Sequence, residues 1–248
     1  MPSRSSLADA RPALALRTRR RRRRRLRAGV VLVLLLAVAG GLTWLVGWSS
    51  VLAATSVEVE GASVLDADEV TAAAAVPLGR PLARVDTGAV ESRVAALLPV
   101  REVTVTRSWP STVRIEVGER TPVLATGTAG GYALVDAAGV AYTTVDDVPD
   151  GVVRAELRGS GGMPADERTE LMVDLATVAT ALSPGLREQV ESVSTDSADT
   201  IELALTGDRV LEWGSAEDSD LKAEVALVLL EQEATTYDVS VPSHPTIR

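Results

Sequence analysis

The chain has 248 residues and a formal net charge of −9, with no Cys, no Phe, one Lys and one His. The missing Cys excludes disulfides and thiol chemistry, and a single His excludes a multi-His zinc site. The charge is unevenly divided. Residues 1–28 hold 11 Arg and one Asp, a charge of +10, so the other 220 residues carry −19. We therefore expect the two parts to meet different surroundings.

An apolar segment follows the basic tail. No residue from Ala28 to Val57 is charged, and this run exceeds the roughly 20 apolar residues that cross about 30 Å of hydrocarbon. We predict a basic cytoplasmic tail over residues 1–27 and a transmembrane helix over residues 28–52. Trp44 and Trp48, one helical turn apart near the far end, are predicted anchors at the membrane interface.

The arginines before the apolar segment predict its orientation, because an Arg excess keeps its flank in the cytoplasm. The expected topology is single-pass type II, with the N-terminus inside and the C-terminus outside the cell membrane. The topology-determining residues are Arg19, Arg20, Arg21, Arg22, Arg23, Arg24, Arg25 and Arg27.

Two other interpretations of this region stay open. Val51-Leu52-Ala53 resembles a signal-peptide cleavage site, and Arg24-Arg25 fits a twin-Arg signal. Against cleavage, the charged region is long and the apolar span exceeds the usual 7–15 residues. The Arg run also suits nucleic acid or anionic lipid. Directly beside a membrane span, orientation and lipid contact are favoured, and no nucleic acid is expected.

The first outer region predicts a small α+β unit. A strand is expected over residues 55–60, a helix after Asp66, and a second helix capped by Asp86. Two alternating runs, residues 100–108 and 112–117, flank a Trp-Pro-Ser break and predict a β-hairpin. The order strand, helix, helix, strand, strand can bury a three-stranded sheet under two helices.

The second outer region predicts a larger mixed unit. Residues 132–145 indicate a hairpin, residues 166–182 a helix, and residues 190–213 three alternating runs. Leu171, Leu175, Val178 and Leu182 are expected to face inward from the helix. A further helix over residues 221–233 is expected to bury Leu221, Val225 and Val228. Residues 237–241 read as a final strand before a Pro-interrupted tail.

Residues suited to catalysis are scarce. His244 lies between Ser243 and Pro245 near the C-terminal end, which argues against a His-based triad. Ser219 and Lys222 match the S-x-x-K nucleophile motif, but the K-T-G element of that class needs a second Lys, so Ser219 is predicted to cap a helix. No phosphate-binding Gly-rich motif exists, and Asp146-Asp147 reads as a solvated loop. We expect no enzyme, no cofactor and no metal.

Several stretches in this order resemble a known family. A basic tail and a single span precede TSVEVEGASVLDADEV, PLARVD and LLPVREVTVTRSWPSTVRIEVGERTPV. These are similar to the POTRA domain of FtsQ/DivIB cell-division proteins, and the Arg107–Pro110 turn and the Glu119–Pro122 exit are the most specific parts. YALVDAAGVAY, GDRVLEWG and the closing YDVSVPSHPTIR continue the resemblance over nearly the whole chain.

The resemblance implies an α+β fold class with one N-terminal transmembrane helix, a small β-α-α-β-β POTRA domain, and a larger mixed α/β domain with a mostly antiparallel sheet. The implied division of the chain is a tail over 1–27, a transmembrane helix over 28–52, a POTRA domain over 53–122, an FtsQ-type β domain over 123–241, and a C-terminal tail over 242–248.

The family implies a non-enzymatic scaffold at the division septum. Its implied partners are FtsL-like and FtsB/DivIC-like bitopic division proteins, with septal peptidoglycan synthases as a further class, so that assembly is coupled to peptidoglycan synthesis. A terminal strand at a sheet edge can receive a partner strand. The residues that match this edge in the family are Tyr237, Asp238, Val239, Ser240 and Val241.

Side-chain specificity at this edge is expected to differ from that of well-studied members, which place a basic and then an aromatic residue where this chain has Ser240 and Val241. Two functions of other classes remain alternatives: a membrane-tethered cell-wall enzyme, and a secreted binding protein released by signal cleavage.

Overall fold

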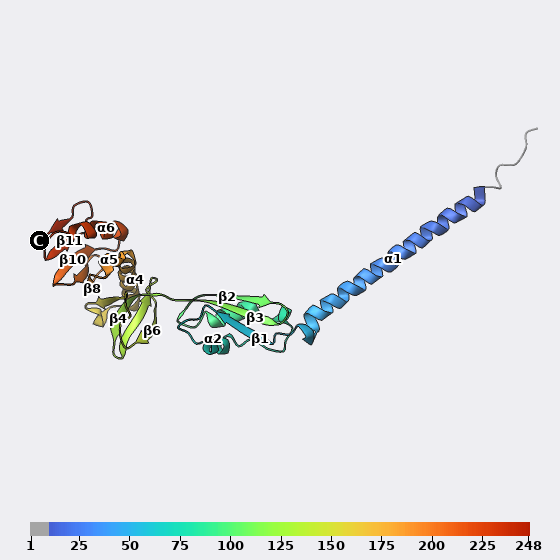
Figure 1. Cartoon of the computed structure of the whole chain (residues 1–248), viewed down its shortest axis with the longest axis horizontal. Helices are drawn as coiled ribbons and strands as arrows, with labels where there is room; N and C mark the ends of the chain where they lie inside the picture. The colour runs from blue at the N-terminus through green and yellow to red at the C-terminus, as the bar shows by residue number, and fades with distance from the viewer. Residues whose placement is uncertain (1–9) are drawn as a thin grey trace, which may run out of the picture. The chain divides into compact units, whose positions relative to one another are not determined.

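A computed structural model of the chain describes residues 10–248, with side chains described for residues 26–159 and 161–248 (Figure 1). The chain divides into two compact units. The first unit holds the residues up to Glu60, Ala67–Arg93 and Thr104–Glu116. The second unit holds Gly61–Asp66, Val94–Val103 and Val117–Arg248.

The first unit begins with one long helix, α1 (Ala10–Trp48). Its stretch Leu26–Trp48 has a mean hydropathy of 2.5 and is long and apolar enough to span a membrane. The helix ends at Trp48, and a short 3-10 turn, η1 (Ser50–Leu52), follows. Of the predicted topology-determining residues, Arg19–Arg25 lie outside the residues whose side chains are described.

A three-stranded sheet and two helices follow α1. The strands β1 (Ser56–Glu60), β2 (Val100–Ser108) and β3 (Thr112–Glu119) are ordered β1-β3-β2, with β1 parallel to β3. Helices α2 (Ala67–Ala74) and α3 (Thr87–Val94) lie between β1 and β2 in the chain. The Asp86 Oδ1 accepts the N–H of Ala89 at 3.1 Å, as the sequence predicts for a cap. The predicted β-α-α-β-β order is confirmed.

A nine-stranded sheet dominates the second unit, in the order β12-β11-β10-β9-β8-β7-β4-β5-β6. Its strands are β4 (Pro122–Thr128), β5 (Gly131–Asp136), β6 (Ala141–Val145), β7 (Val153–Leu157), β8 (Val190–Thr195), β9 (Ile201–Leu205), β10 (Arg209–Gly214), β11 (Thr236–Asp238) and β12 (Thr246–Ile247). Five of the eight neighbouring pairs are antiparallel, and β4–β7, β7–β8 and β10–β11 are parallel. The predicted fold class is therefore confirmed.

Helices lie in two of the three connections between parallel neighbours, and β4 is joined to β7 through β5 and β6. α4 (Ala165–Ala181) and α5 (Pro184–Arg187) join β7 to β8, and α6 (Ser219–Leu229) joins β10 to β11. α4 and α6 contact each other, and both contribute to the large apolar core over the sheet. The predicted inward stripe of α4 is confirmed, because its four residues are all buried.

The predicted inward face of α6 is wrong at two of its three residues, while the third, Val225, is partly buried and packs against the core. Leu221 and Val228 are 48% and 64% exposed, whereas Lys222, Ala223 and Ala226 are buried. The helix begins at Ser219, two residues before the predicted start, and the small Ala side chains allow close packing. Lys222 is accommodated because its ammonium donates to the Ser215 carbonyl at 2.8 Å.

Candidate functional site

The C-terminal segment forms one edge of the nine-stranded sheet. β11 pairs in parallel with β10, with Tyr237 opposite Leu211, and its other side pairs with β12, with Tyr237 opposite Ile247. Tyr237 and Val239 hold β11 in place because both are fully buried in the core. The Tyr237 hydroxyl lies 2.8 Å from the Gln232 carbonyl and accepts the N–H of Ala234 at 3.2 Å.

The sequence predicted that Tyr237–Val241 forms the edge strand of the sheet, and this prediction is wrong. β11 ends at Asp238, and the outermost strand is β12, in the tail that the sequence predicted to be irregular. The Asp238 carboxylate accepts both the N–H (3.0 Å) and the hydroxyl (2.6 Å) of Ser240, which turns the chain. Pro242 then has no N–H to offer a strand, and the chain folds back to pair residues 246–248 with β11.

β12 presents a short edge. Thr236 and Arg248 exchange two backbone hydrogen bonds, at 2.9 and 3.0 Å. In an antiparallel pair the next residue faces the other way, so the N–H and C=O of Ile247 point outward. The Ile247 side chain is 38% exposed, and Ser240 and the 54%-exposed Val241 lie at the turn before β12. Thr246 and Ile247 were missed by sequence reasoning because the Pro residues before them indicate a loop.

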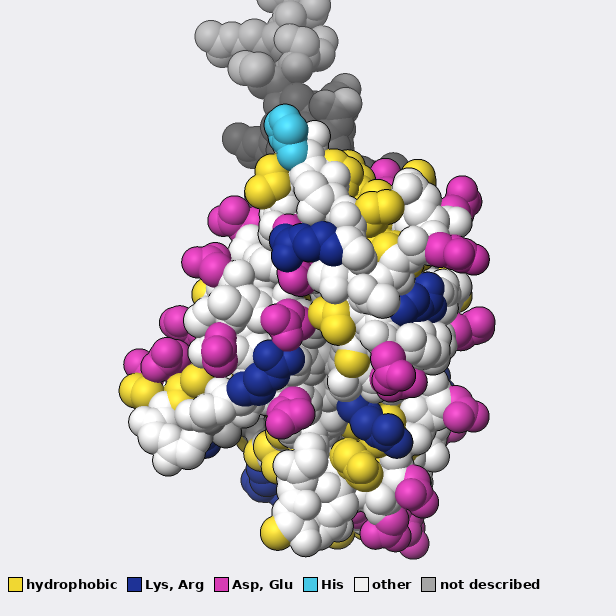
Figure 2. Space-filling view, turned by 90° about the vertical axis from the view of Figure 1, so that its left-hand side faces the viewer, with side chains coloured by type: hydrophobic (Ala, Val, Ile, Leu, Met, Phe, Trp, Pro, Cys, Tyr) yellow, Lys and Arg dark blue, Asp and Glu magenta, His cyan; other side chains and the backbone are white. Residues whose placement is uncertain are grey.

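The face of the molecule on the side of β10, β11 and α6 is polar (Figure 2). Acidic side chains spread over this face with basic ones scattered among them, and the apolar side chains stand in small separate groups. Figure 2 shows no broad apolar area on this face.

The Glu119–Pro122 exit, which the sequence singles out, has a structural role in the second unit. The Glu119 carboxylate accepts the N–H groups of Ser63 (2.9 Å), Val64 (3.0 Å) and Leu65 (2.8 Å), and the Ser63 hydroxyl (2.5 Å). Burial by itself would raise the pKa of Glu119, but these hydrogen bonds outweigh it and lower the pKa from 4.5 to about 2.

Arg120 fixes the next part of the same exit. Its guanidinium bonds the Asp136 carboxylate at 2.5 Å and the Leu98 carbonyl at 2.9 Å. Asp136 is buried and also accepts the N–H groups of Ala138 (3.0 Å) and Val140 (2.9 Å). A buried charge is tolerated here because it is paired and hydrogen-bonded. Both charged residues of the motif therefore position backbone.

The S-x-x-K pair is held by other groups. The Ser219 hydroxyl donates to the Ala216 carbonyl at 2.8 Å and accepts the indole N–H of Trp213 at 3.1 Å. Burial lowers the pKa of Lys222, and the nearby Asp218 and Glu217 oppose that shift. The prediction that Ser219 caps α6 is wrong, because Asp218 occupies the cap position and Ser219 supports the buried indole instead.

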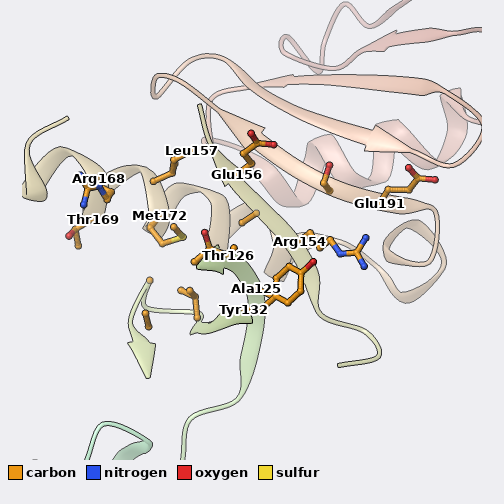
Figure 3. Close-up of a pocket in the computed structure, with 16 residues that line it drawn as sticks. Ala125, Thr126, Tyr132, Arg154, Glu156, Leu157, Arg168, Thr169, Met172 and Glu191 are labelled. Carbon is orange, nitrogen blue, oxygen red and sulfur yellow. The ribbon is translucent and has the colours of Figure 1, made fainter. Parts of the chain in front are cut away.

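A groove of about 960 Å³ in the second unit lies between β4, β7 and α4 (Figure 3). Arg154 and Tyr132 lie together on one side, with the guanidinium 5.9 Å from the ring centre, and Arg168, Thr169 and Met172 come from α4. Glu156 and Glu191 are its acidic residues. No His, Cys or Lys lines it. Among the described residues no cluster of three or more His, Cys, Asp or Glu side chains is suited to a metal.

The predicted membrane anchors lie in the last turns of α1. Trp44 and Trp48 are 62% and 60% exposed. The guanidinium of Arg84, which lies in the short turn η2 (Leu82–Arg84), is 4.1 Å from the centre of the Trp48 ring.

Comparison with known proteins supports one family. Residues 52–120 match the model of the POTRA domain, FtsQ-type. The chain is 40% identical over 204 residues to the cell division protein FtsQ of Streptomyces griseus, covering 80% of this chain and 98% of that protein. It is 40% identical to FtsQ of Streptomyces venezuelae (85% of this chain, 79% of that protein) and 38% identical to FtsQ of Mycolicibacterium smegmatis (86% and 62%). The chain belongs to the FtsQ family of cell division proteins.

Proposed function

We propose that this FtsQ-family protein is a non-enzymatic bitopic scaffold of the divisome. It binds FtsL-like and FtsB/DivIC-like bitopic division proteins outside the cytoplasm and couples septal assembly to peptidoglycan synthesis, with septal peptidoglycan synthases as further partners. The observation that carries this proposal is the edge of the nine-stranded sheet at β12, where the backbone of Ile247 faces outward.

A partner strand adds to that edge by backbone pairing. The exposed residues of the proposed site are Ser240 and Val241 at the turn and Ile247 on β12, while Tyr237, Asp238 and Val239 position β12 from beneath. Backbone hydrogen bonds supply affinity in this recognition mode, and alternate side chains supply specificity. A short edge also suits a regulated contact, because little backbone is open to the wrong partner.

The absence of a catalytic function is supported by the contacts of the candidate nucleophile. Ser219 donates its proton to a carbonyl and Lys222 donates to another, so neither activates the other. The best candidate for a membrane-tethered cell-wall enzyme is thereby accounted for as part of the core.

Retention of the membrane helix is supported by the surroundings of the candidate cleavage site. Ala53 is 5% exposed and bridges to Pro81, and Ala54 is fully buried. We propose that α1 stays attached as a type II anchor with Trp44 and Trp48 at the outer interface. We also propose the domain boundaries 53–122 and 123–241, the first of which the match to residues 52–120 supports.

Replacement of Ile247 by proline tests the site. The Ile247→Pro variant loses the outward N–H while the bonds between Thr236 and Arg248 remain, so β12 stays paired and can no longer donate to a partner. We expect co-purification of the full chain with the FtsL-like and FtsB/DivIC-like proteins from detergent to fall at least tenfold, a loss of about 1.4 kcal/mol.

The matched control is Ile247→Ala, which trims the same side chain and keeps the N–H. It should retain most of the binding, and both variants should unfold within a few degrees of the wild type. Equal binding by Ile247→Pro and the wild type would move the interface away from β12. Wild-type protein that captures neither partner would contradict the proposed scaffold function.

A further inference from the structure

One end of the first unit, which carries neutral and basic residues but no acidic ones, lies directly beside the C-terminal end of α1. Three segments converge there: residues 49–55 after the helix, residues 78–84, and the β2–β3 turn at residues 109–111. The Ala54 N–H donates to the Arg80 carbonyl and the Gly79 N–H to the Ala54 carbonyl, both at 2.8 Å. The Thr55 N–H donates to the Ser111 carbonyl, also at 2.8 Å. The three segments are therefore joined through backbone hydrogen bonds.

These segments are held rigidly. The Arg107 guanidinium donates to the carbonyls of Leu82 (3.2 Å) and Val85 (2.7 Å), and both of those side chains are buried. Arg84 in the same turn stacks on Trp48, the last residue of α1. Because the Trp48 ring and the Arg84 guanidinium are 4.1 Å apart, this end of the unit lies at the depth where the apolar span Leu26–Trp48 stops.

Large apolar side chains are exposed at this end. Val51 is 71%, Leu78 57% and Trp109 51% exposed, so these three side chains lie outside the buried core of the unit. Trp109 sits in the Arg107–Pro110 turn, the most specific motif of the first region, and packing in the core does not account for it. Indoles favour the membrane–water interface because the ring is apolar and the N–H is polar.

The charge at this end is opposite to that of the rest of the outer chain. Residues 49–57, 76–85 and 107–111 contain Arg80, Arg84 and Arg107 and no Asp or Glu, whereas residues 29–248 together carry −19. Arg80, Arg84 and Arg107 are exposed. A basic area in an otherwise acidic domain, next to a bilayer, complements anionic phospholipid headgroups.

We propose that this end, defined by Trp48, Val51, Leu78, Arg80, Arg84 and Trp109 and called here the membrane-proximal patch, rests in the outer headgroup layer of the membrane. Leu78 and Trp109 enter the interface, while Arg80 and Arg84 bind phospholipid phosphates. The patch fixes the first unit against the bilayer. The inference rests on the proposed membrane span and is independent of partner binding at β12.

Site-directed spin labelling tests the patch in the full chain, which has no native Cys. A label at Leu78→Cys is compared with one at Glu116→Cys after reconstitution in vesicles. Glu116 is exposed on β3, about 13 Å along the strand from Thr112, which pairs with Ser56. Collisions with oxygen report apolar depth, and collisions with a water-soluble nickel chelate report water. In vesicles of phosphatidylcholine with phosphatidylglycerol, the label at 78 should be shielded from nickel and the label at 116 should not.

Two variants separate the contributions. Arg80→Gln with Arg84→Gln should weaken the shielding by about fivefold for each arginine in vesicles containing phosphatidylglycerol, and little in pure phosphatidylcholine. Trp109→Ser should weaken the shielding in both vesicle types, and Trp109→Phe should weaken it less.

A label at Leu36→Cys reports the depth of the span itself. If position 36 reads as hydrocarbon and position 78 is as open to nickel as position 116, the patch is overturned while the membrane span stands. If position 36 reads as water, the span fails first.

Discussion

Glu119 shows how one carboxylate organises a segment far from it in sequence. Four donors of residues 63–65 make five hydrogen bonds to its two oxygens, so the loop after β1 is fastened to the end of β3. The sequence singled out Glu119 through a family resemblance, and the structure gives the physical reason. Three successive N–H groups of a loop need an acceptor, and a carboxylate can satisfy all of them.

Replacement of Glu119 by Gln should make the free energy of unfolding depend less on pH in the acid range. The folded pKa of about 2 lies below the ordinary 4.5, so the ionised carboxylate stabilises the fold fully above pH 4.5 and loses this effect as the pH falls towards 2. Glu119→Gln should cost about 1–2 kcal/mol at pH 7, after allowance for solvent screening. Thermal unfolding of the full chain in detergent at several pH values measures it.

The control for this prediction is Glu116→Gln, which changes an exposed carboxylate on the same strand. The difference between wild type and Glu119→Gln should shrink between pH 4.5 and pH 2, and Glu116→Gln should follow the wild type throughout. A Glu119→Gln deficit that stays constant down to pH 2 would show that the hydrogen bonds do not depend on ionisation.

Ser219 separates a structural role from a catalytic one. Ser219→Ala removes the acceptor of the buried Trp213 indole N–H, and an unsatisfied buried donor costs about 1–3 kcal/mol. The unfolding temperature of the variant should therefore fall. The variant should still support normal division when it replaces the wild-type protein in growing cells. Ser219→Thr keeps a hydroxyl and should recover part of the stability. Filamentous cells with folded Ser219→Ala protein would instead favour the enzyme.

At the scale of elements, the sequence predicted those that carry a clear period. α4 and the strands β2, β3, β9 and β10 show period 3.6 or 2 over enough residues to stand out, and the structure contains them. β4 and β7 were missed. In β4 the adjacent Leu124 and Ala125 are both fully buried, so the alternation is lost, whereas β7 alternates in burial but has only five residues. α5 has four residues and begins with Pro184, too little for a helical stripe.

The edge was mispredicted for a different reason. The pairing of β12 with β11 depends on a turn set by Asp238 and Ser240 and on a buried core beneath Tyr237, and neither is visible in a tail of seven residues with two prolines. Likewise the burial of Lys222 depends on a single carbonyl, that of Ser215, placed by the preceding loop. The position of such elements depends on partners far away in the sequence, so it cannot be predicted from the periodicity of their own residues.

Gly214 tests how closely β10 approaches the chain after β11. Its φ is +76°, and an added Cβ would lie 2.8 Å from the Ser240 Cβ. Gly214→Ala should cost about 2–4 kcal/mol, from left-handed backbone strain plus a steric clash. Gly151 has a φ of +77° with open space around it, so Gly151→Ala carries the strain alone and should cost about 1 kcal/mol. Equal losses in urea unfolding would show that the chain near Ser240 yields without cost.

At the scale of the whole molecule, charge is divided among three zones. The tail before the span holds +10, the outer chain holds −19, and the membrane-proximal patch is a basic island within that acidic part. This division fits the proposed single-pass orientation, because each zone suits a different surface. A family identity alone would not show where the outer domain changes its charge.

Neutralising the tail tests the orientation that this charge division predicts. Ser243→Cys, on the exposed tail, should react with a membrane-impermeant maleimide in intact cells, and Ser5→Cys only after permeabilisation. With Arg19–Arg25 and Arg27 replaced by Gln, only three of the eleven arginines before the span remain, so the labelled fraction at position 243 should fall several-fold. Replacing Arg80 and Arg84 instead removes charge from the outer side of the span and should leave that fraction unchanged. Because these two arginines lie beyond the span, a fall in labelling on their loss would mean that the outer charges also set the topology. Full labelling without the tail arginines would mean that the fold of the outer chain decides the topology.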